Sequence, residues 1–302
     1  MRRATPALLG TGFVLAHVAL LAPFVPATDI LSMGSGLLSL SAMALTMALA
    51  ARWQWVDHVM GGPDKSYVAH RWLGFFALGG ALVHWVTADD SGRGIVPFLA
   101  DSAEGVGTFA VVGLLALSAA AMVRIIPYHL WKKSHMLMGP LFIAAAYHSI
   151  FAASPLALGS PPWIVMAGMS VLGLVGWGQT LLRKSASTAL VTVDRVTRFD
   201  GGVDVHVTSE TALAGFRPGQ FATISYDAAG AESHPFTIAG GDAFSRRFVI
   251  RAGGDWTNRF VKSVQPGDQL RLGASVGRFR PQFQETRTEQ LWVAGGVGIT
   301  PF

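Results

Sequence analysis

Four histidines lie inside long apolar segments, where an ionisable side chain is costly and usually has a function. They are His70, His84, His135 and His148. The first two are 14 residues apart and the last two 13, which correspond to rises of ~21 and ~20 Å on α-helices. Two helices carrying these pairs would present histidines at two matched depths. Each depth could supply two axial imidazoles to one haem iron.

The helical phase of the two pairs differs. At ~100° per residue, the first two histidines fall within ~40° of one another, whereas the last two are ~140° apart. Gly139 and Pro140 lie between the last two, and a proline kink can rephase a helix. A lone histidine in a membrane usually only hydrogen-bonds a neighbouring helix. Four at matched depths favour haem ligation.

Two imidazoles per iron leave no open coordination position, so the pattern predicts electron transfer by low-spin, b-type haems. The chain has no cysteine, which excludes disulfides, thiolate haem ligation, Cys-held iron–sulfur clusters and cysteine nucleophiles. Basic residues near the inner pair suit haem propionates or simply mark the cytoplasmic side; they are Arg71, Lys132 and Lys133. Packing or interface roles are expected for the remaining candidates, His17, His58 and His129.

Membrane helices must position these histidines. Hydrophobic residues form 51% of the 302-residue chain and charged residues 14%, and the mean hydropathy is +0.43. A span needs about 20 mostly apolar residues. Six segments meet this criterion: residues 7–26, 31–51, 67–88, 105–126, 131–153 and 162–182. We therefore expect an all-α, six-helix membrane bundle over residues 1–184.

The basic residues set the expected orientation in the lipid bilayer. With six spans, Arg93 is the only Lys or Arg on one side, so the N-terminus and everything after the sixth span are cytoplasmic. The first span lacks a convincing signal-peptide cleavage site. The net charge is +5 and the bases cluster at the ends of apolar runs, which indicates membrane topology and no nucleic-acid partner. The expected outside loop contains four acidic residues: Asp89, Asp90, Asp101 and Glu104.

Residues 185–286 consist of short alternating runs punctuated by glycine and proline, which predict a small antiparallel β-barrel or sandwich. The expected strands are Leu190–Val193, Val203–Val207, Phe221–Ser225, Arg247–Arg251 and Gln269–Leu272. Three motifs accompany them: Arg-Pro-Gly-Gln-Phe at 217–221, His-Pro-Phe-Thr at 234–237, and Arg-Ala-Gly-Gly-Asp-Trp-Thr at 251–257, which opens a helix through Val264.

These motifs resemble the flavin-binding barrel of the ferredoxin reductase superfamily, in the variant found in NADPH oxidases and ferric reductases. The resemblance implies that Phe236 packs near the isoalloxazine, that Thr237 hydrogen-bonds near its reactive nitrogen, and that His234 replaces an arginine of soluble relatives. Glycines before a helix N-terminus also suit a pyrophosphate. The candidate FAD contacts are His234, Pro235, Phe236, Thr237 and Ile238, with Arg251, Gly254, Trp256 and Thr257 on the phosphate side. One departure from relatives is Gly-Ala-Ser-Val-Gly at 273–277.

Residues 287–302 contain a short apolar run followed by a glycine-rich turn, typical of the first strand and turn of an α/β nucleotide-binding domain. The turn resembles the NAD(P)H pyrophosphate turn of the same superfamily, and the matching residues are Gly295, Gly296, Gly298, Thr300 and Pro301. The helix and the rest of the sheet do not follow. We therefore expect a shortened form of a longer enzyme that does not use NAD(P)H productively by itself.

The whole chain resembles the bacterial ferric reductase and NADPH oxidase superfamily, including the segment 128–135 that leads to the inner histidine. The resemblance implies that His70 pairs with His135 on the inner haem and His84 with His148 on the outer haem. NAD(P)H would then reduce FAD, and electrons would pass singly through two haems to an extracytoplasmic acceptor. This predicts an NAD(P)H-dependent flavohaem oxidoreductase of the bacterial cytoplasmic membrane.

The acceptor is left open by the sequence. Oxygen, giving superoxide, needs only a small pocket, whereas a ferric chelate needs recognition outside the membrane, for which the four acidic residues are candidates or merely solvated. An alternative is a haem-bearing electron-transfer subunit that serves a separate periplasmic protein or quinone. A helix bundle without redox function is a third class.

Overall fold

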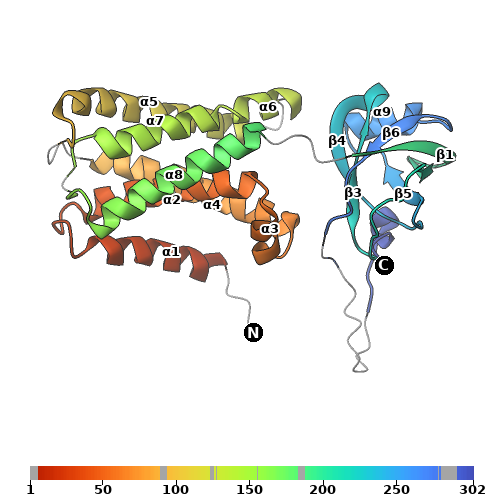
Figure 1. Ribbon diagram of the computed structural model, residues 1–302, viewed down its shortest axis with the longest axis horizontal. Coiled ribbons are helices and arrows are strands. Elements are labelled where there is room, and N and C mark those ends of the chain that lie inside the picture. Colours follow the sequence, from red (N-terminus) through yellow and green to blue (C-terminus); the bar gives the residue numbers. More distant parts are fainter. Residues whose placement is uncertain are drawn as a thin grey trace. The chain divides into compact units, whose positions relative to one another are not determined.

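The computed structural model describes residues 6–88, 94–122, 126, 128–154, 156–182, 188–277, 279 and 291–302. The chain forms two compact units. One consists of Met1–Met60 and Lys65–Arg183, and the other of Lys184–Phe302 with the short segment Gly61–Asp64. The first is helical and the second is built around a β-sheet (Figure 1).

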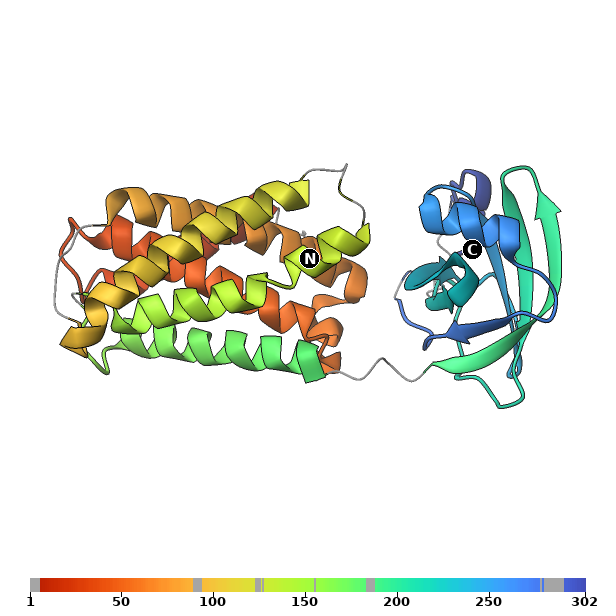
Figure 2. The same cartoon turned by 90° about the horizontal axis from the view of Figure 1, so that it is seen from above.

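The helical unit is a bundle of long helices that run side by side (Figure 2). Its helices are α1 (Pro6–Leu21), α2 (Ile30–Ala50), α3 (Gln54–Met60), α4 (Pro63–Thr87), α5 (Pro97–Met122), α6 (Tyr128–His135), α7 (Met138–Phe151) and α8 (Pro161–Leu182). Four begin at a proline, which is favoured in the first turn because the backbone N–H has no intrahelical acceptor there. Helix α2 packs along α8, and α5 packs along α7.

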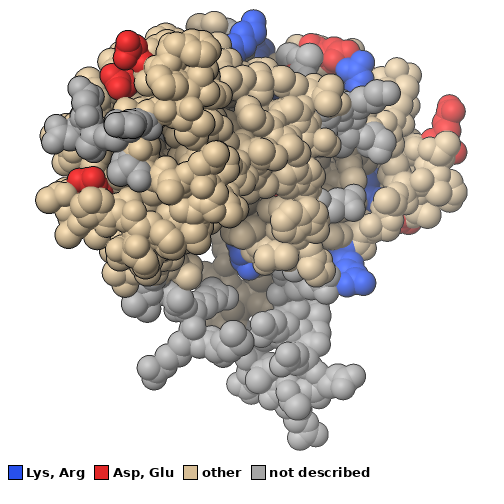
Figure 3. Space-filling model, turned by 60° about the vertical axis from the view of Figure 1, so that its left-hand side comes forward, with Lys and Arg blue, Asp and Glu red and all other residues tan. Residues whose placement is uncertain are grey.

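Three described helices are long and apolar enough to cross a membrane: α2, α5 and α8. A shorter apolar helix covers Leu9–Leu21. The expected third span corresponds to α4, whose hydropathy is lowered by its charged and histidine residues, and the expected fifth span is divided between α6 and α7. Six helical segments are therefore found where spans were expected, but the count of six spans stays a prediction. Large apolar side chains such as Leu15, Phe109 and Val171 are exposed, and Figure 3 shows a surface with few charged residues.

The break between α6 and α7 lies before Pro140. Tight backbone bonds join Leu137 N to Ser134 O at 3.0 Å and Gly139 N to Met136 O at 3.3 Å. Pro140 follows in the first turn of α7, where it cannot donate a bond back to the preceding turn. Between the histidines of the last pair, the expected single span is thus two helices joined by the turn residues Met136 and Leu137.

Helix α5 begins eight residues earlier than the expected span, at Pro97. Asp101 and Glu104 consequently belong to its first turns and not to a loop, which corrects their expected location. The proline explains the early start, since it is well suited to the first helical position. Asp89, Asp90 and Arg93 lie outside the described residues.

The second unit contains a six-stranded antiparallel sheet in the order β4-β3-β6-β1-β2-β5. Its strands are β1 (Ala189–Phe199), β2 (Gly202–Thr208), β3 (Phe221–Tyr226), β4 (Gly230–Thr237), β5 (Ser245–Arg251) and β6 (Gln269–Leu272). The antiparallel architecture expected from the alternating pattern is present. No strand pairing joins the two edges, β4 and β5, among the described residues, so a fully closed barrel is not observed. An isolated bridge links Gly240, in the connection after β4, to Arg247 of β5.

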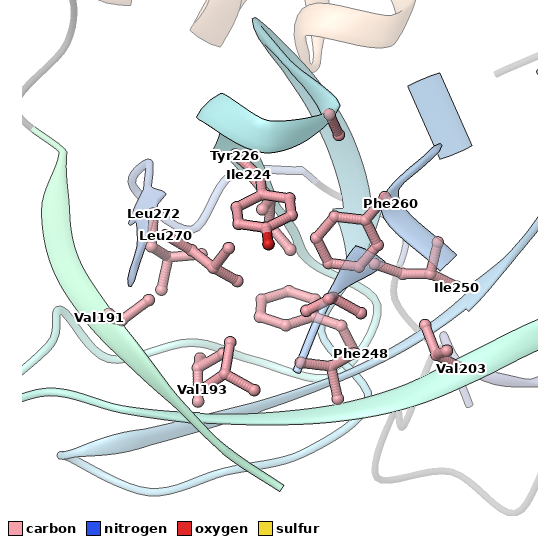
Figure 4. Close-up of a cluster of buried hydrophobic side chains, with 14 of the residues drawn as sticks. Val191, Val193, Val203, Ile224, Tyr226, Phe248, Ile250, Phe260, Leu270 and Leu272 are labelled. Atoms are coloured by element: carbon pink, nitrogen blue, oxygen red, sulfur yellow. The ribbon is translucent and has the colours of Figure 1, made fainter. Parts of the chain in front are cut away.

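Alternate residues of these strands fill one apolar core. Val203, Phe248 and Ile250 are at most 1% exposed, as is Trp256 from helix α9 (Asp255–Ser263). Figure 4 shows side chains from β1, β2, β3, β5, β6 and α9 meeting there. Tyr226 lies at its margin, where burial and a 2.6 Å hydrogen bond to Asp268 raise the pKa of Tyr226 to about 12.

The last described segment differs from its expected structure. Residues 291–295 form no strand, and the glycine-rich turn is a short 3₁₀ helix, η2 (Gly296–Ile299). Leu291 and Val293 are 90% and 80% exposed. A parallel strand is stable only beside partner strands of its own sheet, and the described residues provide none here.

Candidate functional site

The outer pair of histidines is assembled from α4 and α7. The ring centroids of His84 and His148 are 5.8 Å apart. His84 Nδ1 donates to the carbonyl oxygen of Ser32 on α2 at 2.9 Å, and His148 Nδ1 donates to that of Ala103 on α5 at 2.9 Å. Because a carbonyl only accepts, these bonds assign the proton to Nδ1 and leave each Nε2 with a free lone pair. Both rings are thus oriented as metal ligands are.

The inner pair is assembled from α4 and α6. The ring centroids of His70 and His135 are 6.1 Å apart. His70 Nδ1 donates to the carbonyl oxygen of Thr46 on α2 at 3.2 Å. Thr46 and Ser32 are 14 residues apart, the spacing of the two α4 histidines, so one face of α2 orients both. His135 Nδ1 is buried and has no hydrogen-bond partner among the described residues.

The separation within each pair matches a shared metal ion. With roughly 2 Å from each nitrogen to the metal and about 1.1 Å from nitrogen to ring centre, two imidazoles on one ion have centroids about 6 Å apart. Among the described residues, no group of three or more His, Cys, Asp or Glu could hold a metal. A metal held by only two side chains needs further donors from a cofactor such as a porphyrin. The donor set therefore fits haem.

Two glycines make room for the outer pair. A Cβ at Gly107 on α5 would lie 2.4 Å from His148 Nδ1, and a Cβ at Gly36 on α2 would lie 2.9 Å from His84 Nδ1. Both glycines also line a cavity of about 450 Å³ together with the two histidines. Such a volume lies within the range of ligand and cofactor sites, ~300–1,000 Å³. The small residues thus admit both the rings and a flat cofactor.

Sequence reasoning missed several of these supporting groups. The backbone carbonyls of Ser32, Thr46 and Ala103 cannot be recognised from the sequence, because every residue carries such a carbonyl. Gly36 and Gly107 have a weak signal, since they are small residues at the depth of the outer histidines. His17, expected to have a packing role, is 8% exposed and bonds to Phe13 O at 2.8 Å and Ser41 Oγ at 3.0 Å.

In the second unit, strand β4 presents the expected flavin residues on two faces. His234 and Phe236 share the face toward α9, where their rings lie 4.5 and 5.7 Å from that of Trp256. Pro235 and Thr237 lie on the opposite face by strand alternation. Ile238 is 2% exposed. His234 Nε2 is also 3.3 Å from a carboxylate oxygen of Glu232.

The expected phosphate-side residues separate into core and surface groups. Trp256 is 1% exposed and stacks on Phe260 at 5.0 Å, so its indole belongs to the core. Thr257 Oγ1 accepts from the amides of Gly253 and Gly254, both at 2.9 Å, which caps α9. Arg251 is exposed, and its Nη1 lies 3.6 Å from the position of a Cβ at Gly296.

The glycine-rich turn therefore meets Arg251 at the end of β5. Gly296 has φ +54°, a conformation that glycine adopts without steric cost. Of the other expected NAD(P)H residues, Gly295 and Gly298 are exposed and Thr300 and Pro301 are half-buried. A guanidinium beside a glycine-rich turn is a chemically suitable place for a phosphate group.

Residues 35–146 match the family model described as the ferric reductase like transmembrane component. This match covers a little more than a third of the chain, almost all of it in the helical unit. The matched region covers three of the paired histidines, His70, His84 and His135, and ends two residues before His148. No curated protein matches the chain.

Several solved structures are similar to parts of the chain. A ferredoxin reductase in carbazole 1,9a-dioxygenase is 23% identical over 32% of this chain and 31% of its own, with a TM-score of 0.29. Phthalate dioxygenase reductase is 13% identical over 38% and 37%, with a TM-score of 0.30. A flavohemoglobin from Malassezia yamatoensis is 13% identical over 94% and 70%, with a TM-score of 0.41. The chain thus spans about a third of the first two.

Proposed function

We propose that the chain is a transmembrane reductase that passes electrons from cytoplasmic NAD(P)H, through FAD and two b-type haems, to an acceptor on the other side of the membrane. The observation that carries this proposal is the presence of two histidine pairs, 5.8 and 6.1 Å between centroids, in a ferric reductase-like domain. Haem bound at each pair would supply a one-electron carrier, and FAD would convert a hydride into single electrons.

The protein's own part in the membrane steps is positional. Donation from Nδ1 to a backbone carbonyl fixes the tautomer and the ring plane of three ligands and makes each Nε2 a better donor. If both histidines of a pair held one haem iron, oxygen would have no free position at which to bind the iron directly. An acceptor would then have to take its electron at the edge of the cofactor. Oxygen and a ferric chelate are the two candidates, and no acid–base residue is required.

In the second unit, Thr237 and Pro235 lie on the face of β4 that points away from the core, and Arg251 lies beside the Gly296 turn. We assign flavin contact to the β4 residues and a phosphate to Arg251. Trp256 would support His234 and Phe236 from behind, because it is buried under both rings.

The first test is to purify the chain in detergent, supply haemin and FAD, and count haem per chain by absorption before and after dithionite. Two low-spin haems per chain are expected. His148→Ala should leave one, whereas His17→Ala, which removes a buried histidine with two hydrogen bonds of its own, should leave two. A folded preparation without a haem spectrum would overturn the proposal.

The flavin role and the acceptor need separate measurements. Thr237→Ala should slow flavin-to-haem electron transfer while haem content stays unchanged, and unchanged kinetics would remove that role.

To identify the acceptor, chemically reduced protein is mixed with oxygen or a ferric chelate. Haem oxidation without any added protein favours a direct acceptor. Oxidation only with a periplasmic protein or a quinone would favour the electron-transfer subunit instead.

A further inference from the structure

The four paired histidines differ in how their rings are held. Three of them donate from Nδ1 to a backbone carbonyl of a neighbouring helix, at 2.9, 2.9 and 3.2 Å. The fourth, His135, has a buried Nδ1 without a hydrogen-bond partner among the described residues. A ring without this bond is free to turn about its Cβ–Cγ bond unless something else restrains it.

A ring contact is found at His135 in place of that bond. The indole of Trp131 stacks on the imidazole with 5.2 Å between centroids and 16° between planes. None of the other three paired histidines has a near-parallel ring contact among the described residues; their pair partners lie at 58° and 65°. Trp131 is four residues before His135 on α6, and such residues lie on the same helix face.

The local backbone makes this contact more important. Helix α6 has only eight residues and ends at His135, and the next helix begins at Met138. The histidine is thus followed by two turn residues, Met136 and Leu137, and not by a further turn of its own helix. A large, rigid ring one turn earlier is the one described group whose plane parallels the imidazole.

We propose that Trp131 is a positioning residue of the inner haem site: its stacked indole sets the ring plane of His135 in place of the carbonyl bond that orients the other three ligands. This inference rests on the proposed function. It makes the inner site sensitive to the side chain of Trp131, whereas each ring of the outer pair donates to a backbone carbonyl.

The test uses a His148→Ala chain, in which the proposed function leaves only the inner haem. Trp131→Leu removes the aromatic face, Trp131→Phe keeps one, and Trp72→Leu is a matched control. Trp72 is 46% exposed, two residues after His70, and its ring makes an edge contact with that of Phe75 at 5.9 Å. The readouts are the rate of haem transfer to an excess of a haem-scavenging protein and the low-spin electron paramagnetic resonance spectrum.

Trp131→Leu should release haem about 3- to 10-fold faster, the size expected for loss of one aromatic stack, and should shift the low-spin g-values. Trp131→Phe should stay within about twofold of the parent, and Trp72→Leu should match it. Equal release rates and spectra for Trp131→Leu and its parent would overturn the proposal.

A second measurement distinguishes a local effect of Trp131→Leu on the inner haem site from a general folding defect. In the chain with all four histidines, Trp131→Leu should disturb the inner haem signal and leave the outer one intact. Loss of both signals together would count against a positioning role. A wild-type chain without two low-spin haems refutes the proposed function itself, so this preparation is measured before any variant.

Discussion

Gly107→Ala is expected to weaken haem binding at the outer site while leaving the inner site unchanged. The added Cβ would lie 2.4, 2.7 and 2.8 Å from the Nδ1, Cγ and Cε1 atoms of His148. Carbon atoms in contact are normally about 3.5–4.0 Å apart, so the imidazole must retreat by about 1 Å. The 2.9 Å bond from its Nδ1 to Ala103 O would then be lost.

The expected loss of haem affinity follows from the steric clash and the lost hydrogen bond. Overpacking of a filled site costs about 1–3 kcal/mol, and a net hydrogen bond contributes about 0.5–1.5 kcal/mol. Together they amount to about 1.5–4.5 kcal/mol, or roughly a 10- to 1,000-fold weaker outer site. The assay is a haemin titration of the detergent-solubilised chain, in which one of two binding phases should move to higher concentration.

Gly105→Ala provides the control for Gly107→Ala. It introduces the same methyl group two residues earlier on α5, where a Cβ meets nothing within 4 Å. Its titration should match that of the wild type. Two unshifted binding phases in Gly107→Ala would refute the reasoning that α5 sets the position of the His148 ring.

Further outcomes are expected from other parts of the chain. Gly36→Ala should weaken the outer haem less than the α5 substitution, about 3- to 10-fold, because its Cβ would stand 2.9 Å from His84 Nδ1; an effect on the inner binding phase would contradict this. Hydrogen bonds from Arg247 hold the pKa of Asp204 below its usual range. Asp204→Asn should therefore speed amide hydrogen exchange of β2 and β5 at pH 7, and the difference from wild type should vanish as pH falls through the depressed folded-state pKa; a difference that persists in acid would argue against the ion pair. Trp256→Ala should lower the free energy of unfolding of the second unit by about 3–5 kcal/mol in a urea titration, and a loss below 1 kcal/mol would exclude a core role for the indole.

Much of the architecture of both units was predictable from the sequence. Membrane helices give long continuous apolar segments, whereas the strands of a sheet give short runs in which apolar and polar residues alternate. The matched spacings of the four histidines predicted two levels, and the structure brings His70 to His135 and His84 to His148. The alternating pattern located most strands, and the helix expected through Val264 is α9. These features follow from residue type and spacing alone.

Other features depend on information that residue type does not carry. The chain is apolar on both sides of the break before Met138, so hydropathy alone predicts one continuous helix there. The break is set by backbone conformation near Pro140, which hydropathy does not report. Pro97 is a signal for the early start of α5. The acidic residues that follow it favour a loop in a hydropathy-based prediction. Strand β4 was hidden because its proline and polar residues resemble a turn.

The eight-residue length of α6 has a consequence for how the protein matures. Isolated helices of this length are marginal, because few backbone bonds offset the entropy of nucleation. Without cofactor, α6 should open by itself in a low-energy local fluctuation, while α4 and α7 remain protected. Ligation of His135 and His70 by one iron would link the short segment to a 25-residue helix and close that fluctuation through mass action. Haem binding at the inner site would thus stabilise α6, and slow amide exchange in α6 would report that this site is occupied.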